Sequence, residues 1–204
     1  MQPRPPGQGR AQPMQKPNAI KRRRILEEAA RLFATKPYHD VRLEDVAARA
    51  KVGKGTIYIY FPGKDELYLC LIDEGFAQLV TQLGAQEQDR RGSARAALQR
   101  ILAALVHFAV EHPHLSELMR STAGGAGTRW AQARGQLTGV IEGTIRRGIK
   151  RGEFSDPHPE LTALCIPGLV RSVMLFGPRN LDERAVTRHH GRLLERGLAR
   201  EGKP

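Results

Sequence analysis

Apolar residues recur every three to four positions along most of this 204-residue chain, and no alternating strand pattern competes with them. This spacing predicts helices throughout. A first helix is predicted from Asn18 to just before Pro37, and a longer one from Lys64 to Glu87. The apolar stripe of the longer helix consists of Leu67, Leu71, Ile72, Phe76, Leu79, Val80 and Leu83. The expected fold class is therefore all-α.

The stretch VRLEDVAARAKVGKGTIYIYFPGK, residues 41–64, predicts two short helices joined by a tight turn. Leu43, Val46, Ala47 and Ala50 share one face of the first. Ile57 and Phe61 lie four residues apart in the second, which is consistent with inward anchors. We attribute the turn to Gly53, because glycine tolerates the positive φ that a sharp reversal needs. Two short helices in this arrangement form a helix-turn-helix, whose second helix enters the DNA major groove.

The outer side of the predicted second helix carries residue types that proteins use on DNA. They are Lys54, Gly55, Thr56, Tyr58 and Tyr60. Lysine binds phosphate or guanine, threonine and tyrosine hydroxyls bind base edges or phosphates, and a small residue permits close backbone approach. Lys64 stands at the start of the next predicted helix, where its charge can reach a phosphate.

The run VGKGTIYIYFPGKDEL, preceded by LEDVAARA and IKRRRILEEAARLFA, resembles the DNA-binding region of the tetracycline-repressor (TetR) family of bacterial transcription regulators. The resemblance implies that six residues contact DNA: Lys54, Gly55, Thr56, Tyr58, Tyr60 and Lys64. Arg42 replaces the threonine that usually caps the first motif helix; it lacks the short oxygen of an N-cap but can contact a phosphate. The alternative is a three-helix bundle that binds no nucleic acid.

The net positive charge is concentrated in the first third of the chain. The formal net charge is +12, and the segment through Lys64 holds fourteen Lys and Arg against five Asp and Glu, which leaves +3 for the remaining 140 residues. Such an uneven distribution indicates a surface that binds a polyanion. Residues 1–17 are rich in Pro, Gly and Gln without an acid, which predicts a disordered basic tail, either inert or adding to DNA attraction.

We expect a helix-turn-helix domain over residues 18–63 and a helical ligand-binding and dimerisation domain over 64–204. Helices are predicted at 93–111, 113–120, 128–151, 157–176 with Asp156 as cap, and 182–200. Pro167 should kink or split its helix.

We read the loop STAGGAGT as a helix connection and Cys70 and Cys165 as buried free thiols. No apolar run approaches a membrane span and no signal peptide is evident, so we expect a cytoplasmic protein without a membrane partner.

Two groups of residues in the second half could bind a ligand or a metal. The family resemblance implies a small-molecule cavity, with candidates Phe76, Leu79, Phe108, Met119, Trp130 and Arg171, although each apolar one fits an ordinary core as well. Arg171 could pair with an acidic ligand or across a dimer interface. His107, Glu111, His112 and His114 cluster in sequence, but Pro113 interrupts them, so we favour local polar contacts over a metal. No catalytic constellation, metal site or cofactor site is expected, and so no enzyme.

The sequence is interpreted as a dimeric, ligand-responsive transcription regulator, read as a repressor of a palindromic operator on double-stranded DNA. The resemblance implies a homodimer through the last two helices, whose apolar faces include Leu164, Val170, Val173, Leu193, Leu194 and Leu198. The effector is an unidentified small molecule. Two alternatives remain: a nonspecific DNA-binding protein, and a small-molecule-binding helical protein without operator specificity.

Overall fold

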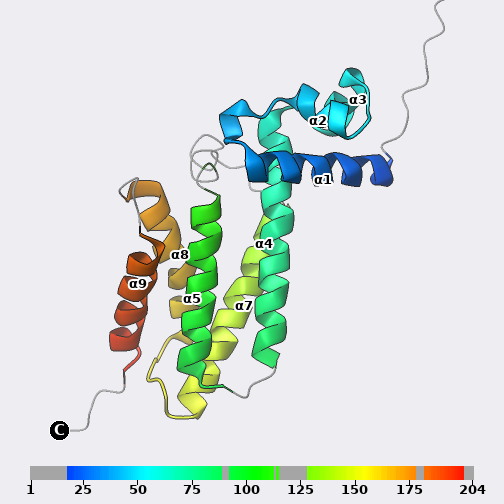
Figure 1. Ribbon diagram of the computed structural model, residues 1–204. Helices are drawn as coiled ribbons and strands as arrows, with labels where there is room; N and C mark the ends of the chain where they lie inside the picture. Colours follow the sequence, from blue (N-terminus) through cyan, green and yellow to red (C-terminus); the bar gives the residue numbers. More distant parts are fainter. Residues whose placement is uncertain (1–17, 89–91, 113, 115–127, 178–181, 200–204) are drawn as a thin grey trace, which may run out of the picture. The chain divides into compact units, whose positions relative to one another are not determined.

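The computed structural model describes residues 18–88, 92–112, 114, 128–177 and 182–199, and for residues 88 and 128–130 only the backbone (Figure 1). Every regular element in these ranges is helical, which confirms the all-α class. The elements are α1 (Ala19–Thr35), η1 (Tyr38–Asp40), α2 (Leu43–Arg49), α3 (Lys54–Tyr60), α4 (Lys64–Gln88), α5 (Ala94–Glu111), α7 (Thr128–Lys150), α8 (Pro159–Phe176) and α9 (Glu183–Gly197). The expected tail 1–17, the loop STAGGAGT and nearly all of the expected helix 113–120 lie outside the described residues.

The chain divides into two compact units, Met1–Leu67 and Tyr68–Pro204, so that the boundary falls inside α4. Asn18, where the first helix was predicted to begin, is the N-cap of α1, since its side-chain oxygen accepts hydrogen bonds from the backbone N–H groups of Ile20 and Lys21. Ile57 and Phe61 are 0% and 1% exposed, which confirms them as the inward anchors of α3. They share the core with Ile25, Ala29 and Leu32 of α1 and with Leu43, Val46 and Ala47 of α2.

The turn between α2 and α3 differs from the sequence prediction. Gly53 has an ordinary φ of −66°, and the positive φ of 51° belongs to Lys51. Lys51 stands just after the C-cap of α2, where a left-handed residue commonly ends a helix. Its carbonyl accepts a hydrogen bond from the Arg24 guanidinium at 3.1 Å, so α1 supports the unusual conformation. The attribution of the positive φ to Gly53 was wrong. Residue propensity shows which residue tolerates a positive φ, but not which position of the turn adopts one.

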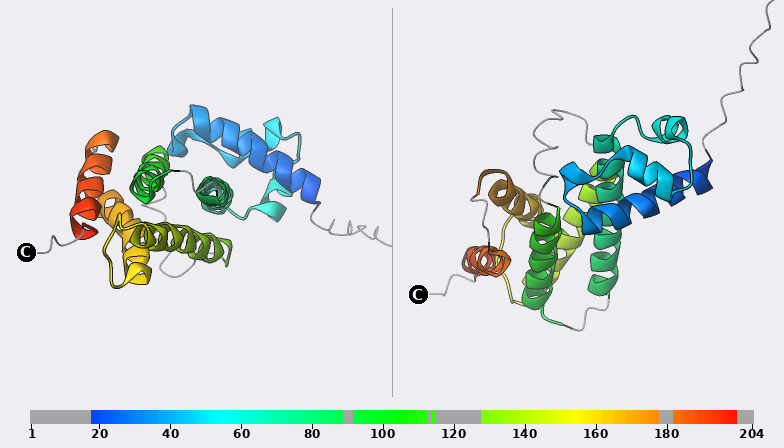
Figure 2. Two further views of the ribbon diagram at one scale, coloured as in Figure 1. Left: turned by 90° about the horizontal axis from the view of Figure 1, so that it is seen from below. Right: turned by 45° about the horizontal axis from the view of Figure 1, so that its top comes forward.

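The second unit packs α5 among α7, α8 and α9, with α7 also lying against α8. Figure 2 shows α5 between α9 on one side and the part of α4 beyond Tyr68 on the other. The fully buried positions come from α5, α7 and α8 and include Ile101, Leu102, Leu137, Ile141, Ile145 and Ile166. Gly148 of α7 is required by close packing, because a Cβ there would lie 2.2 Å from the Phe154 ring.

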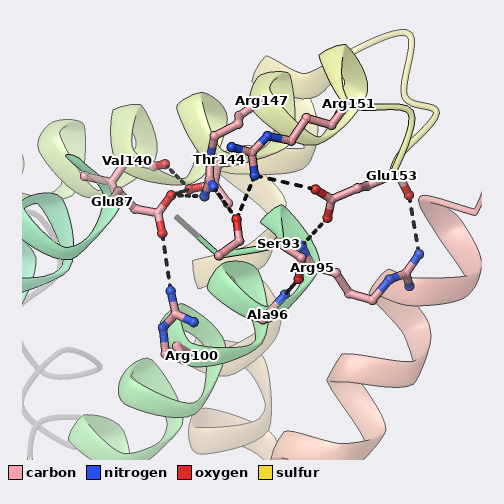
Figure 3. Close-up of polar contacts among 11 residues, drawn as sticks. Glu87, Ser93, Arg95, Ala96, Arg100, Val140, Thr144, Arg147, Arg151 and Glu153 are labelled. Carbon is pink, nitrogen blue, oxygen red and sulfur yellow. Dashed lines mark hydrogen bonds and ion pairs between the residues drawn. The ribbon is translucent and has the colours of Figure 1, made fainter. Parts of the chain in front are cut away.

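Ion pairs and hydrogen bonds hold the end of α4 against α5 and α7 (Figure 3). The Glu87 carboxylate accepts hydrogen bonds from the Arg147 guanidinium at 2.5 Å and the Thr144 hydroxyl at 2.8 Å. Arg100 of α5 approaches the other oxygen at 3.9 Å. The side chains of Glu87 and Arg147 are only 14% and 13% exposed, so this pair is largely shielded from water. It fixes the C-terminal end of α4 in the second unit.

The helix α8 departs from expectation in three respects. It starts at Pro159 rather than Pro157, because the Asp156 carboxylate accepts from the His158 N–H and closes a turn before the helix. It continues through Pro167 to Phe176 and is not split. It is also long and apolar enough, by length and composition alone, to cross a membrane, so the statement that no such run exists was wrong. The core helix of a soluble protein passes the same test.

Burial in α8 and α9 also corrects the sequence prediction. Only 22% of α8 is buried within the chain. Val170 and Leu198, expected on a free face, are in the core at 5% and 3% exposure, whereas Leu161, Leu164, Phe176 and Leu193 are the exposed apolar residues. Cys165 is exposed and Cys70 is half-buried, so the prediction of two buried thiols was wrong; both are free cysteines.

Candidate DNA-recognition surface and effector cavity

The exposed side of α3 presents Lys54, Gly55 and Tyr58, whereas Thr56 and Tyr60 are half-buried. This arrangement follows in part from the anchors, because burial of Ile57 turns the positions two residues away, Gly55 and Ile59, toward solvent. Ile59 is 55% exposed, an apolar residue on this helix that the sequence analysis did not single out. The periodicity of the helix alone could have identified it, since it lies two residues from Ile57.

Nothing in the described part of the chain requires glycine at position 55. A Cβ built on it would meet no atom within 4 Å, and its φ is not in the left-handed region. A glycine in a helix costs roughly 0.5–1 kcal/mol relative to alanine. Gly143 of α7 is equally open, so open space alone does not identify a partner; what distinguishes Gly55 is its place on the exposed side of the second helix of a helix-turn-helix. At such a position, glycine permits close approach of another surface to the helix backbone.

Glu44 of α2 lies against the same surface. Its carboxylate is 3.1 Å from the Lys54 ammonium and accepts a hydrogen bond from the Tyr58 hydroxyl at 3.4 Å. The pKa of Glu44 is lowered, first by a backbone hydrogen bond at its own position and then by Lys54. The pKa of Lys54 is raised by its hydrogen bond to Glu44. Both groups are therefore charged at neutral pH, and the Glu44 carboxylate holds the Lys54 ammonium in the DNA-free protein.

We expect Glu44→Gln to strengthen DNA binding several-fold at low salt, since the change frees Lys54 and Tyr58 and removes a negative charge beside the phosphates. Fluorescence anisotropy with a labelled duplex measures this. Glu142→Gln, which alters net charge equally but lies on α7, serves as the control. Equal affinities for the Glu44 variant and wild type would show that DNA does not approach this side of α3.

The remaining predicted contacts have partners inside the first unit. The Lys64 ammonium donates to the carbonyls of Tyr38 and His39 at 3.0 and 3.4 Å and lies 4.4 Å from the Tyr38 ring centroid. The Tyr60 hydroxyl accepts from the Asn18 N–H at 2.8 Å, a bond that leaves its own proton to be donated. Arg42 is exposed at the N-cap of α2 and makes no side-chain cap, as its chemistry predicts. Lys64 and Tyr60 thus stabilise the fold whether or not they also reach phosphate.

A cavity of about 190 Å³ lies within the second unit, between α4, α5, α7 and α8. It is lined by Phe76, Leu105, Phe108, Ala109, His112, Arg134, Leu137, Thr138, Leu164, Pro167, Gly168, Val170, Arg171, Met174 and Leu175. A single water needs only about 10–15 Å³, and an engineered cavity of about 150 Å³ binds benzene. The space therefore accommodates the apolar body of a small organic molecule.

Three of the six predicted ligand residues, Phe76, Phe108 and Arg171, line this cavity. Leu79 is not part of the lining; it is partly buried against the core of the second unit. Met119 and the side chain of Trp130 lie outside the described residues. Arg134 is the main lining residue that the sequence analysis missed, because it stands among other polar residues of α7 and only the fold brings it beside α8.

The histidines that were weighed as a metal site make separate contacts. The His107 ring nitrogen is 3.3 Å from a Glu183 carboxylate oxygen, and the His112 ring lies edge-on to Phe108 with centroids 4.6 Å apart. Burial lowers the pKa of His112, outweighing the opposing effect of Glu111. Within the described part of the chain, no group of three or more His, Cys, Asp or Glu residues is arranged to hold a metal.

Comparison with known proteins agrees with this helix-turn-helix and helical-bundle geometry. Residues 25–71 match the family described as "Bacterial regulatory proteins, tetR family", and residues 91–175 match "Tetracyclin repressor-like, C-terminal domain". The uncharacterized HTH-type transcriptional regulator YhgD of Bacillus subtilis is 31% identical over 147 residues, covering 68% of this chain and 74% of that protein. YuxN of the same organism is 32% identical over 92 residues, but the match spans only 31% of its length and 45% of this chain.

Among solved structures, a transcriptional regulator from Saccharomonospora viridis in complex with choline superimposes with a TM-score of 0.66. The pair is 25% identical, and the match covers 90% of this chain and all of the other. These similarities define a bacterial helix-turn-helix transcription regulator rather than an enzyme. The chain belongs to the TetR family.

Proposed function

We propose that this protein is a repressor that binds a palindromic operator as a homodimer and leaves it when a small molecule occupies the second unit. The observation that carries the DNA part is the exposed face of α3, above all Gly55, which nothing inside the chain requires. Lys54, Thr56 and Tyr58 would read base edges or phosphates around it. Arg42, Tyr60 and Lys64 would add phosphate contacts at the margins of this surface. Such a protein acts on cytoplasmic DNA.

Binding through these residues has a measurable electrostatic signature. The logarithm of the DNA association constant should fall linearly with the logarithm of the salt concentration, with a slope of about −0.9 per phosphate contact. Titration of a labelled duplex at several salt concentrations measures the slope. An affinity that does not change with salt would exclude DNA binding through this basic surface and favour a helical small-molecule-binding protein.

The proposed dimer rests on the outer faces of α8 and α9. Leu161 and Leu164 of α8 and Leu193 of α9 are 55%, 56% and 47% exposed, although α8 is among the most apolar stretches of the chain. Large apolar side chains that a chain leaves exposed in this way are candidates for an interaction site. A second copy of the chain is the occupant that a palindromic operator needs, because twofold symmetry in the protein matches twofold symmetry in the DNA.

Leu164→Glu should convert the dimer to a monomer at micromolar concentration, since two buried like charges would meet near the twofold axis. Sedimentation velocity measures the change, and operator affinity should fall with it because only one half-site is then held. Gln136→Glu on the exposed side of α7 introduces the same charge as a control. A wild-type protein that sediments as a monomer would contradict the proposed dimer.

The proposed effector site is the cavity lined by Phe76, Phe108 and Arg171; Met119 and Trp130 stay predictions. A cavity in this position can influence DNA binding because Phe76 belongs to α4, the helix whose first residue is Lys64. An effector shifts the equilibrium only as far as it binds one arrangement of α4 better than another. The choline complex of the S. viridis regulator supports the idea that this fold holds small molecules.

A further inference from the structure

The charges around the cavity are of one sign. Its lining contains two arginines, Arg134 from α7 and Arg171 from α8, and no aspartate or glutamate. Both arginines are exposed, and among the described residues neither forms an ion pair or a side-chain hydrogen bond with a neighbour. The Thr138 hydroxyl is already used, since it donates to the backbone carbonyl of Arg134 at 3.0 Å.

The apolar walls lie apart from these cations. Phe76, Leu105, Leu137 and Val170 are each at most 6% exposed and form the inner lining. His112 adds a ring but no fixed charge, because burial lowers its pKa and keeps it neutral at pH 7. Among the described lining residues, the cavity thus combines a buried apolar interior with positive charge from Arg134 and Arg171.

From this combination we propose that the effector is an amphiphilic anion, a carboxylate on an apolar body, whose carboxylate binds Arg134 and Arg171 while its body fills the space beside Phe76 and Phe108. Arginine is suited to this task since its planar guanidinium donates two parallel hydrogen bonds to a carboxylate. A cationic ligand would face repulsion from both arginines, and a neutral one would gain no charge-assisted hydrogen bond from them. This inference rests on the proposed effector cavity and specifies its ligand class.

Three probes of one shape and different charge separate the possibilities: benzoate, benzyl alcohol and benzylammonium, each of a size suited to a cavity of about 190 Å³. Dissociation constants are measured by ligand-observed NMR titration of the full chain at fixed ionic strength. We expect benzoate to bind about tenfold more tightly than benzyl alcohol, the effect of one charge-assisted interaction with exposed groups, and benzylammonium to bind most weakly.

The variant Arg134→Gln/Arg171→Gln should lose the preference for benzoate and keep its affinity for benzyl alcohol, because the apolar walls are unchanged. Arg196→Gln on α9, which removes a charge away from the cavity, should bind all three probes as wild type does and so excludes a general attraction of anions to a basic protein. Thermal melting checks that each variant folds.

Equal binding of benzoate and benzyl alcohol, or an undiminished benzoate preference in the double variant, would overturn the anion assignment while leaving the cavity as an effector site. Failure of all three probes to bind would overturn the cavity itself. Monomeric sedimentation of the double variant with its benzoate preference intact would assign the arginines to the contact between copies instead.

Discussion

Gly55→Ala is expected to weaken operator binding roughly 10- to 100-fold while making the free protein slightly more stable. The added methyl meets nothing within the chain, so α3 gains up to about 0.5–1 kcal/mol from the better helix former. On DNA the same methyl would separate the backbone of α3 from the groove. Loss of one close contact of this kind is comparable to loss of one base contact, about 1–3 kcal/mol.

Opposite effects on stability and affinity are the informative result, because a variant that merely misfolds would lose both. Anisotropy titration with operator DNA and urea denaturation measure the two quantities. Gly143→Ala on α7 is the matched control, since a Cβ there also meets nothing within 4 Å. It should raise stability without changing DNA affinity. Unchanged operator affinity in Gly55→Ala would show that DNA does not approach α3 at this residue.

Glu87→Ala should lower the free energy of unfolding of the second unit by roughly 2–4 kcal/mol. The change removes the carboxylate that the Arg147 guanidinium and the Thr144 hydroxyl share, and leaves Arg147, only 13% exposed, without its anion. Leaving a largely buried charge uncompensated costs more than the pair itself contributes, about 3–5 kcal/mol at full burial. A drop in Tm of roughly 5–15 °C is expected for a unit of this size.

Glu142→Ala provides the comparison, because Glu142 also pairs with an arginine of α7, Arg146, at 2.7 Å but with half of the arginine side chain exposed. Its loss should cost no more than about 1 kcal/mol. In a double-mutant cycle, Arg147→Ala should recover part of the stability that Glu87→Ala loses, since it removes the uncompensated charge. Equal losses for the Glu87 and Glu142 variants would mean that water reaches Arg147 freely and that α4 is held mainly by apolar contacts.

The first unit could be predicted closely from the sequence because its signals are local. The Asn18 cap, the stop before Pro37 and the four-residue spacing of Ile57 and Phe61 each act within one or two helical turns. The positive φ at Lys51 could not be predicted, since it depends on a hydrogen bond from Arg24, 27 residues earlier. The hydrogen bonds that Lys64 and Tyr60 make inside the first unit were also not predicted, because both side chains bind backbone groups distant in sequence.

The second unit was predicted less completely because several helices are apolar on more than one side. In α8 the exposed Leu164 and the buried Val170 look alike in sequence, and only packing against α5 and α7 separates the core face from the free one. Arg134 and Arg171 stand 37 positions apart and meet only across a cavity that the fold creates. Likewise, local periodicity does not predict the ion pair between Glu87 and Arg147, which are 60 positions apart.

The central claim, sequence-specific DNA recognition by a twofold-symmetric regulator, is tested most directly by selection of binding sites from a random-sequence duplex library with the purified full chain. The account predicts enrichment of one inverted repeat whose half-sites are centred about one helical turn, roughly 34–36 Å, or a multiple of it apart. That enrichment should disappear in Gly55→Ala. A library that emerges with no sequence enriched, despite retention on the protein at low salt, would contradict operator recognition and identify a nonspecific DNA-binding protein.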